Sequence, residues 1–190
     1  MQTKKTGITV QRLVTNALLI ALYIILGFFK IPIGNLLRFN LASFAVVVCA
    51  VAFSPIDGLI VGFLGEFLSQ ILGPYGLTPT TVLWALPEAV RGLLLGIIML
   101  IFAKKQLTPS NPFKSKSMIW YMIACVITGI IASLLNTFAL YVDSKMFGYY
   151  NHYMVFGILF VRLCIAVVMS GAFGYLALFI VTALRRNKNI

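Results

Sequence analysis

Two ionisable residues, Glu88 and Arg91, stand inside a long apolar run and are the residues of this sequence best suited to bind a ligand. They are three positions apart, so on a helix they face the same side. Arg91 offers a fork of N–H donors that matches a carboxylate, and Glu88 would orient that fork. Pro87 frees a backbone carbonyl at nearly the same depth. A second interpretation stays open, in which the pair neutralises itself and only locks helices together.

Trp84 extends this pair into a possible pocket. It lies four residues before Glu88 and seven before Arg91, which places the three side chains on one stripe of a helix. An aromatic wall beside an arginine is a common way of holding a small organic anion. The candidate ligand-binding set is completed by polar and aromatic residues of the flanking segments: Arg38, Asn40, Tyr75 and Asn136.

Each of these additional residues also has a simpler explanation. Arg38 would be solvated or bound to lipid phosphate at a membrane surface, and Tyr75 would belong to an aromatic belt at the interface. Asn136 is equally suited to a hydrogen bond between helices. The sequence alone leaves these alternatives open.

Three further residues have no assigned role. Glu66 and Arg162 are charged residues inside apolar runs, and we expect a structural ion pair between them, with the ligand as the alternative partner of Arg162. His152 is the only histidine, and no second ligand stands at metal-binding spacing, so neither a metal nor a cofactor is expected. Catalytic and ATP-binding motifs are also missing, which argues against an enzyme and against ATP hydrolysis by this chain.

The composition identifies the environment of these residues as a membrane. Hydrophobic residues make up 61% of the 190 residues and charged residues 10%, with a mean hydropathy of +1.02. Soluble domains have about 45–50% and about 25% respectively. The 15 Lys and Arg against 4 Asp and Glu do not indicate a nucleic-acid binder, because they lie between apolar runs and form no basic face.

The apolar runs predict an all-α integral membrane protein, a single bundle of six transmembrane helices in one domain that covers residues 1–190. The expected spans are 12–29, 41–53, 56–73, 80–103, 118–142 and 153–184. With six spans, ten basic residues fall on the side of the termini, against three on the other side (Lys30, Arg38 and Lys145). Positive charge marks the cytoplasmic side, so both termini are expected there.

Ala17 and Ala21 in the first span have the small-xxx-small spacing that lets another helix approach closely. Together with six spans, a polar first outer loop and the Pro-Gly junction 54–58 (SPIDG), this resembles the substrate-binding S component of an energy-coupling factor (ECF) vitamin transporter with a shared energising module. The resemblance covers nearly the whole chain. It implies a bacterial plasma-membrane protein that binds a water-soluble vitamin near its outer face. It also implies that Ala17 and Ala21 dock on a membrane coupling subunit that carries two cytoplasmic ATPases.

The ligand is inferred from two short segments. Residues 73–76 (GPYG) and 79–84 (PTTVLW), with Arg91 and Gly92, look most like pantothenate-specific members, whereas 35–39 (NLLRF) is similar to folate members. We expect pantothenate, with folate or another small vitamin as the alternative. A channel, an intramembrane enzyme and a purely structural membrane subunit are the competing classes, and the last leaves Arg91 and Arg162 without a purpose.

Overall fold

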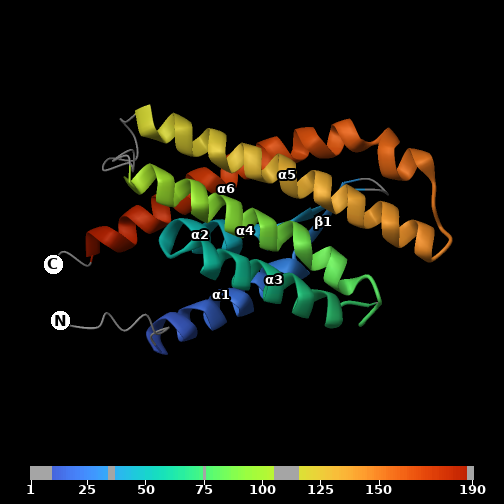
Figure 1. Cartoon of the computed structure of the whole chain (residues 1–190), viewed down its shortest axis with the longest axis horizontal. Coiled ribbons are helices and arrows are strands. Elements are labelled where there is room, and N and C mark those ends of the chain that lie inside the picture. Colours follow the sequence, from blue (N-terminus) through green and yellow to red (C-terminus); the bar gives the residue numbers. More distant parts are fainter. Residues whose placement is uncertain (1–9, 34–36, 75, 105–115, 188–190) are drawn as a thin grey trace.

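The computed structural model describes residues 10–33, 37–74, 76–104 and 116–187, which form one elongated helical bundle. In chain order the elements are α1 (Val10–Phe28), β1 (Lys30–Ile33), β2 (Leu37–Asn40), α2 (Ser43–Ala52), α3 (Pro55–Ile71), α4 (Thr81–Lys104), α5 (Lys116–Met146), the π-helical turn η1 (Tyr153–Gly157) and α6 (Leu159–Asn187). The start of α1 and the end of α6 lie at the same end of the bundle (Figure 1), which we call the terminal end. The opposite end, where α5 leads into η1, is called the far end.

Six α-helices were predicted and six are present among the described residues, but only four are long and apolar enough to cross a membrane. These four spans are Val10–Phe28, Thr81–Phe102, Met118–Met146 and Tyr153–Ala183. The ten residues of α2 rise about 15 Å, roughly half of a hydrocarbon core of about 30 Å. The prediction of six full spans therefore has to be reduced to four clear ones, with α2 and α3 as shorter helices packed among them.

A two-stranded hairpin corrects the all-α prediction. Strands β1 and β2 pair antiparallel, with Lys30 opposite Asn40 and Ile33 opposite Leu37. The sequence predicted an irregular loop here because of Pro32, which cannot donate to a strand ladder. A hairpin of only two strands has edges on both sides, so this proline is tolerated in it.

Glycines let α3 and α4 touch backbone to backbone. A Cβ on Gly92 would lie 2.1 Å from the carbonyl oxygen of Gly58, and a Cβ on Gly62 would lie 2.4 Å from the carbonyl oxygen of Glu88. Neither position has room for any larger residue without a shift of a helix. The glycine-rich sequence of α3 thus fixes how close α4 lies, and with it the position of Glu88.

The main apolar core lies toward the terminal end and joins α2, α4, α5 and α6. Its largest fully buried side chains are Tyr121 and Leu95, packed with Val47, Cys125 and Phe173. The hydroxyl of Tyr121 donates to the carbonyl of Gly174 at 2.9 Å, so the buried polar group is satisfied.

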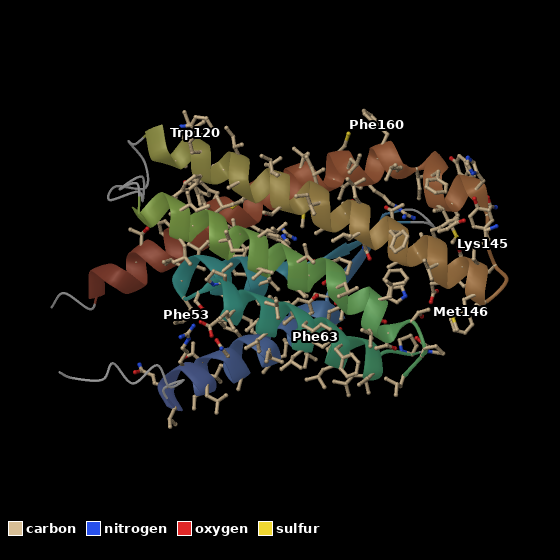
Figure 2. All side chains as sticks on the ribbon, in the orientation of Figure 1. Phe53, Phe63, Trp120, Lys145, Met146 and Phe160 are labelled. Atoms are coloured by element: carbon tan, nitrogen blue, oxygen red, sulfur yellow. The ribbon has the colours of Figure 1, made fainter. Side chains whose placement is uncertain are left out.

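Large apolar side chains also point outward from the bundle over its whole length (Figure 2). Phe160 is 77% exposed and Trp120 is 56% exposed, and many aliphatic residues of the other helices are similarly uncovered. A soluble monomer rarely exposes contiguous apolar surface on this scale. The surface therefore agrees with a protein embedded in lipid.

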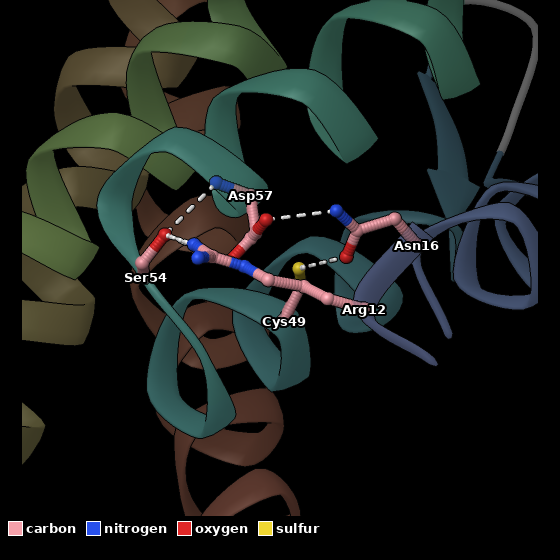
Figure 3. A network of polar contacts seen from close by, with 5 residues as sticks. All are labelled: Arg12, Asn16, Cys49, Ser54 and Asp57. Atoms are coloured by element: carbon pink, nitrogen blue, oxygen red, sulfur yellow. Dashed lines mark hydrogen bonds and ion pairs between the residues drawn. The ribbon is translucent and has the colours of Figure 1, made fainter. Parts of the chain in front are cut away.

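A polar cluster at the terminal end fastens α1 to α3 (Figure 3). Ser54 caps α3, and its hydroxyl donates to the carboxylate of Asp57 at 2.7 Å. Arg12 donates through Nε to the same carboxylate at 2.7 Å, and Asn16 donates to its second oxygen at 2.8 Å. The Sγ of Cys49 lies 4.0 Å from the side-chain oxygen of Asn16. The sequence analysis assigned Arg12 only to the charge count, although a Ser-Pro-x-Asp helix start followed by a buried acid is a signal for such a cluster.

Candidate ligand-binding site

A buried polar cluster crosses the middle of the bundle and contains the predicted pair Glu88 and Arg91. Ser43 of α2 donates to Glu88 Oε1 at 2.6 Å. Arg91 is 6% exposed, and its Nη2 donates to the hydroxyl of Ser170 on α6 at 3.1 Å. The shortest distance between the two charged groups is 3.9 Å, from Arg91 Nη1 to Glu88 Oε1. We call these four residues, from α2, α4 and α6, the central cluster.

The central cluster has unused hydrogen-bonding capacity. Glu88 Oε2 and Arg91 Nε are both buried and have no hydrogen-bond partner. Charge-assisted hydrogen bonds are normally about 2.7–2.9 Å long, so the ion pair at 3.9 Å is a loose one. A free acceptor and a free donor thus lie next to one another in a place where unpaired polar groups are costly.

Close helix contacts hold this cluster at its depth. The carbonyl of Glu88 lies against Gly62, as described above, and α5 approaches α6 closely at Gly129. A Cβ on Gly129 would lie 1.8 Å from the Oγ of Ser170. The serine that accepts from Arg91 is therefore wedged between two helices and has little freedom to move away.

The other predicted ligand-binding residues are placed as follows. Trp84 is half-buried on α4, whereas Asn136 is exposed on α5. The side-chain oxygen of Asn40 accepts from the backbone N–H of Ala42 at 2.9 Å, at the entry to α2. Arg38 belongs to β2 by its backbone, and its side chain lies outside the described part, as does the whole of Tyr75. Among the described members of the predicted set, only Glu88 and Arg91 are brought into direct contact.

The expected ion pair between Glu66 and Arg162 is not found among the described residues. Glu66 accepts from the hydroxyl of Tyr23 at 2.6 Å and from the amide of Gln70 at 2.6 Å. Arg162 donates to the carbonyl of Met154 at 2.9 Å. That carbonyl belongs to η1, where the irregular turn leaves a backbone acceptor for a nearby donor. The prediction treated the two charges as needing each other, and each has found neutral partners on its own side.

An open apolar cleft of about 320 Å³ lies between α5 and the η1–α6 segment toward the far end. It is lined by Leu134, Thr137, Phe138, Tyr141, Phe156 and Leu159. None of the predicted ligand-binding residues lines it.

The two alanines of α1 lie on the outer face of the bundle. Ala17 and Ala21 are exposed, whereas Asn16, Tyr23 and Gly27 of the same helix are buried against α2 and α3. No described part of this chain covers the outer face of α1, so a partner helix has access to it.

No group of three or more His, Cys, Asp and Glu in the described part of the chain could hold a metal ion. Sequence reasoning missed Ser43 and Ser170 of the central cluster. Single serines in apolar helices carry no periodic signal, and only the folded structure brings them to Glu88 and Arg91.

Comparisons with known proteins give both a family and a fold. The model of the family described as "ECF-type riboflavin transporter, S component" matches residues 7–186. The crystal structure of the S component for biotin from an ECF-type ABC transporter is similar with a TM-score of 0.61 and 19% sequence identity, over 98% of this chain and 95% of that one. At this identity the likeness is one of fold.

Two relatives come from Streptococcus thermophilus and bear the names UPF0397 protein str0306 (strain CNRZ 1066) and UPF0397 protein (strain ATCC BAA-491 / LMD-9). They are 30% identical over 125 residues and 31% identical over 117 residues. The matched segments span 65% and 61% of this chain and the same shares of the relatives' own lengths.

Proposed function

Because this chain belongs to the family of S components of ECF-type riboflavin transporters, we propose that it binds one water-soluble vitamin in the membrane and delivers it for ATP-driven uptake. The observation that carries the proposal is the family match over residues 7–186, joined to an S-component fold over 98% of the chain. The four clear membrane spans agree with this role.

The central cluster is the site that we propose for recognition of the ligand. Arg91 has an unpaired Nε and Glu88 has an unpaired Oε2, so together they match a ligand that presents an acceptor beside a donor. Amide, ureide and hydroxy-acid groups of water-soluble vitamins all have this arrangement. Because both atoms are enclosed, α4 has to shift slightly for the ligand to reach them. Trp84, one turn before Glu88, would line the path.

Pantothenate is the ligand that we propose from the residues themselves. Its carboxylate suits the guanidinium of Arg91, and its amide and hydroxyl groups suit Glu88 and the neighbouring serines. Riboflavin is the second candidate, because the family description names riboflavin transporters. Folate remains the alternative indicated by segment 35–39.

The remaining predicted site residues are assigned to the outer part of the same pocket. Arg38 and Asn40 come from the hairpin and Asn136 from the far half of α5, so they would contact the ligand on its way in. Tyr75 would contribute an aromatic side chain at the outer interface. We propose that both termini are cytoplasmic, which puts the far end on the outside.

The outer face of α1 is the proposed docking surface for the membrane coupling subunit. Ala17 and Ala21 are exposed and small, which allows a partner helix to pack closely against them. Two cytoplasmic ATPase subunits bound to that partner would supply the energy, since this chain shows no ATPase motif.

A reconstituted uptake assay tests the proposal. Vesicles that contain this chain, the coupling subunit and the two ATPases should accumulate the radiolabelled vitamin when ATP is present on the ATPase side. Vesicles without this chain should not. If accumulation is the same with and without the chain, the proposed function is wrong.

A further inference from the structure

The cleft between α5 and the η1–α6 segment takes no part in the vitamin site proposed above. We propose that it holds one acyl chain of an anionic phospholipid, with the phosphate bound to Lys145. This interaction is independent of the vitamin and of the coupling module.

The walls of the cleft suit a hydrocarbon chain. Leu134 is 46% exposed, Phe138 is 56% exposed and Phe156 is 42% exposed, so the cleft opens to the side of the bundle. Both walls belong to helices that are long and apolar enough to span the membrane, and the opening therefore faces lipid. The hydroxyl of Thr137 is already used, since it donates to the carbonyl of Ser133 at 3.0 Å.

The same walls do not suit a water-soluble vitamin. Such a ligand carries many polar groups, and burying each of them without a partner costs about 1–3 kcal/mol. Beyond Thr137, the hydroxyl of Tyr141 is the only other side-chain polar group of the lining residues. An acyl chain leaves nothing unpaired there.

Lys145 stands on the same stripe of α5 as the lining residues. Leu134, Phe138, Tyr141 and Lys145 follow one another at intervals of four, three and four residues, which is the spacing of one helix face. Lys145 is exposed, and Figure 2 places it at the far end of the bundle. Among the described residues no carboxylate forms an ion pair with it.

The distances along α5 match a phospholipid. Lys145 lies about 6 Å beyond Tyr141 and about 16 Å beyond Leu134, at a rise of about 1.5 Å per residue. The cation rests 4.0 Å above the ring of Tyr150, whose edge meets Tyr141 with ring centres 5.7 Å apart. Tyrosines are typical of the headgroup level of a membrane, so the ammonium group lies where a lipid phosphate does.

Lipid retention by the purified full chain tests this inference. The protein is exchanged into nanodiscs of equal parts phosphatidylglycerol and phosphatidylcholine, released into detergent, and examined by native mass spectrometry for bound lipid. The wild-type chain should retain phosphatidylglycerol in preference to phosphatidylcholine. The variant Lys145→Gln should reduce that preference about five-fold, the contribution of one basic residue near an anionic surface.

Filling the cleft should remove both lipids. Leu159→Trp does this from the α6 wall, and Leu134→Trp does it from the α5 wall if the first variant fails to fold. Two matched controls should behave as wild type: Lys116→Gln, at the other end of the same helix, and Leu18→Trp, at an exposed position of α1.

Three results would overturn the inference. The first is equal retention of the two lipids by the wild-type chain. The second is unchanged retention in both tryptophan variants of the cleft. The third is displacement of the lipid by any vitamin, because the cleft would then belong to the vitamin site.

Discussion

The loose ion pair of the central cluster makes a double-mutant cycle informative. The variants are Glu88→Gln, Arg91→Met and the two changes combined. Removing one partner of a buried pair leaves the other charge without compensation, which costs about 3–5 kcal/mol. The separation of 3.9 Å and the two unpaired atoms point to the lower value, so each single variant should lose about 3 kcal/mol of unfolding free energy.

The combined variant should lose clearly less than the sum of the two single losses. It removes both charges, and what remains is mainly the packing and hydrogen-bonding change at Ser43 and Ser170. We expect a coupling energy of at least about 2 kcal/mol, within the range measured for residues in contact. Unfolding free energies would be obtained from SDS titrations in mixed micelles, with helicity followed by circular dichroism. Losses that add to within about 0.5 kcal/mol would refute the idea that the two side chains form one electrostatic unit.

The same variants separate a structural role from ligand recognition. Arg91→Ala should abolish vitamin binding while the bundle keeps its helicity, and the combined variant should also fail to bind although its stability is largely restored. Binding by the combined variant at wild-type strength would show that the central cluster only joins helices.

Three other changes have definite expected outcomes. Ala17→Trp should leave vitamin binding intact but block uptake with the coupling module, because it obstructs the outer face of α1; surviving uptake would remove the docking assignment. Gly62→Ala should lower the unfolding free energy by about 1–3 kcal/mol through overpacking against α4, whereas Gly171→Ala, which meets nothing within 4 Å, should not, and equal thermal midpoints would contradict this. Asp57→Asn should loosen α1 from α3 and cost about 1 kcal/mol, a low figure because Arg12 is 38% exposed on its side chain; faster proteolysis near α1 is the expected readout, and an unchanged rate would argue against a fastening role.

The number and order of the helices were predictable because each apolar run is bounded by polar, proline or glycine residues. Span length was predicted less well. The run 41–53 yields a helix of only ten residues, since Phe53, Ser54 and Pro55 end α2 and start α3 within a few positions. The hairpin was missed because eleven residues with a proline and a glycine carry little strand signal.

The candidate site was predictable only in part. Glu88 and Arg91 could be found because charges in an apolar helix are rare, and their contact follows from a spacing of three. Their partners Ser43 and Ser170 come from helices far away in the sequence, so no local pattern announces them. The expected partnership of Glu66 with Arg162 failed for a related reason: charge alone does not say which neutral groups will be nearer.

The vitamin itself was inferred from short segments of sequence, and the family match leaves the choice among vitamins open at the level of individual contacts. The fold similarity at 19% identity adds the architecture and no ligand. Pantothenate and riboflavin differ strongly in shape and polarity, so a direct comparison separates them.

The central claim is that this chain alone binds a water-soluble vitamin. Calorimetric titration of the purified, detergent-solubilised protein with pantothenate, riboflavin, folate and biotin tests it most directly. The account predicts saturable one-to-one binding of one of these vitamins, lost in Arg91→Ala and retained in Ala17→Trp. Absence of binding to all four by protein whose helicity and monodispersity show it to be folded would contradict the account.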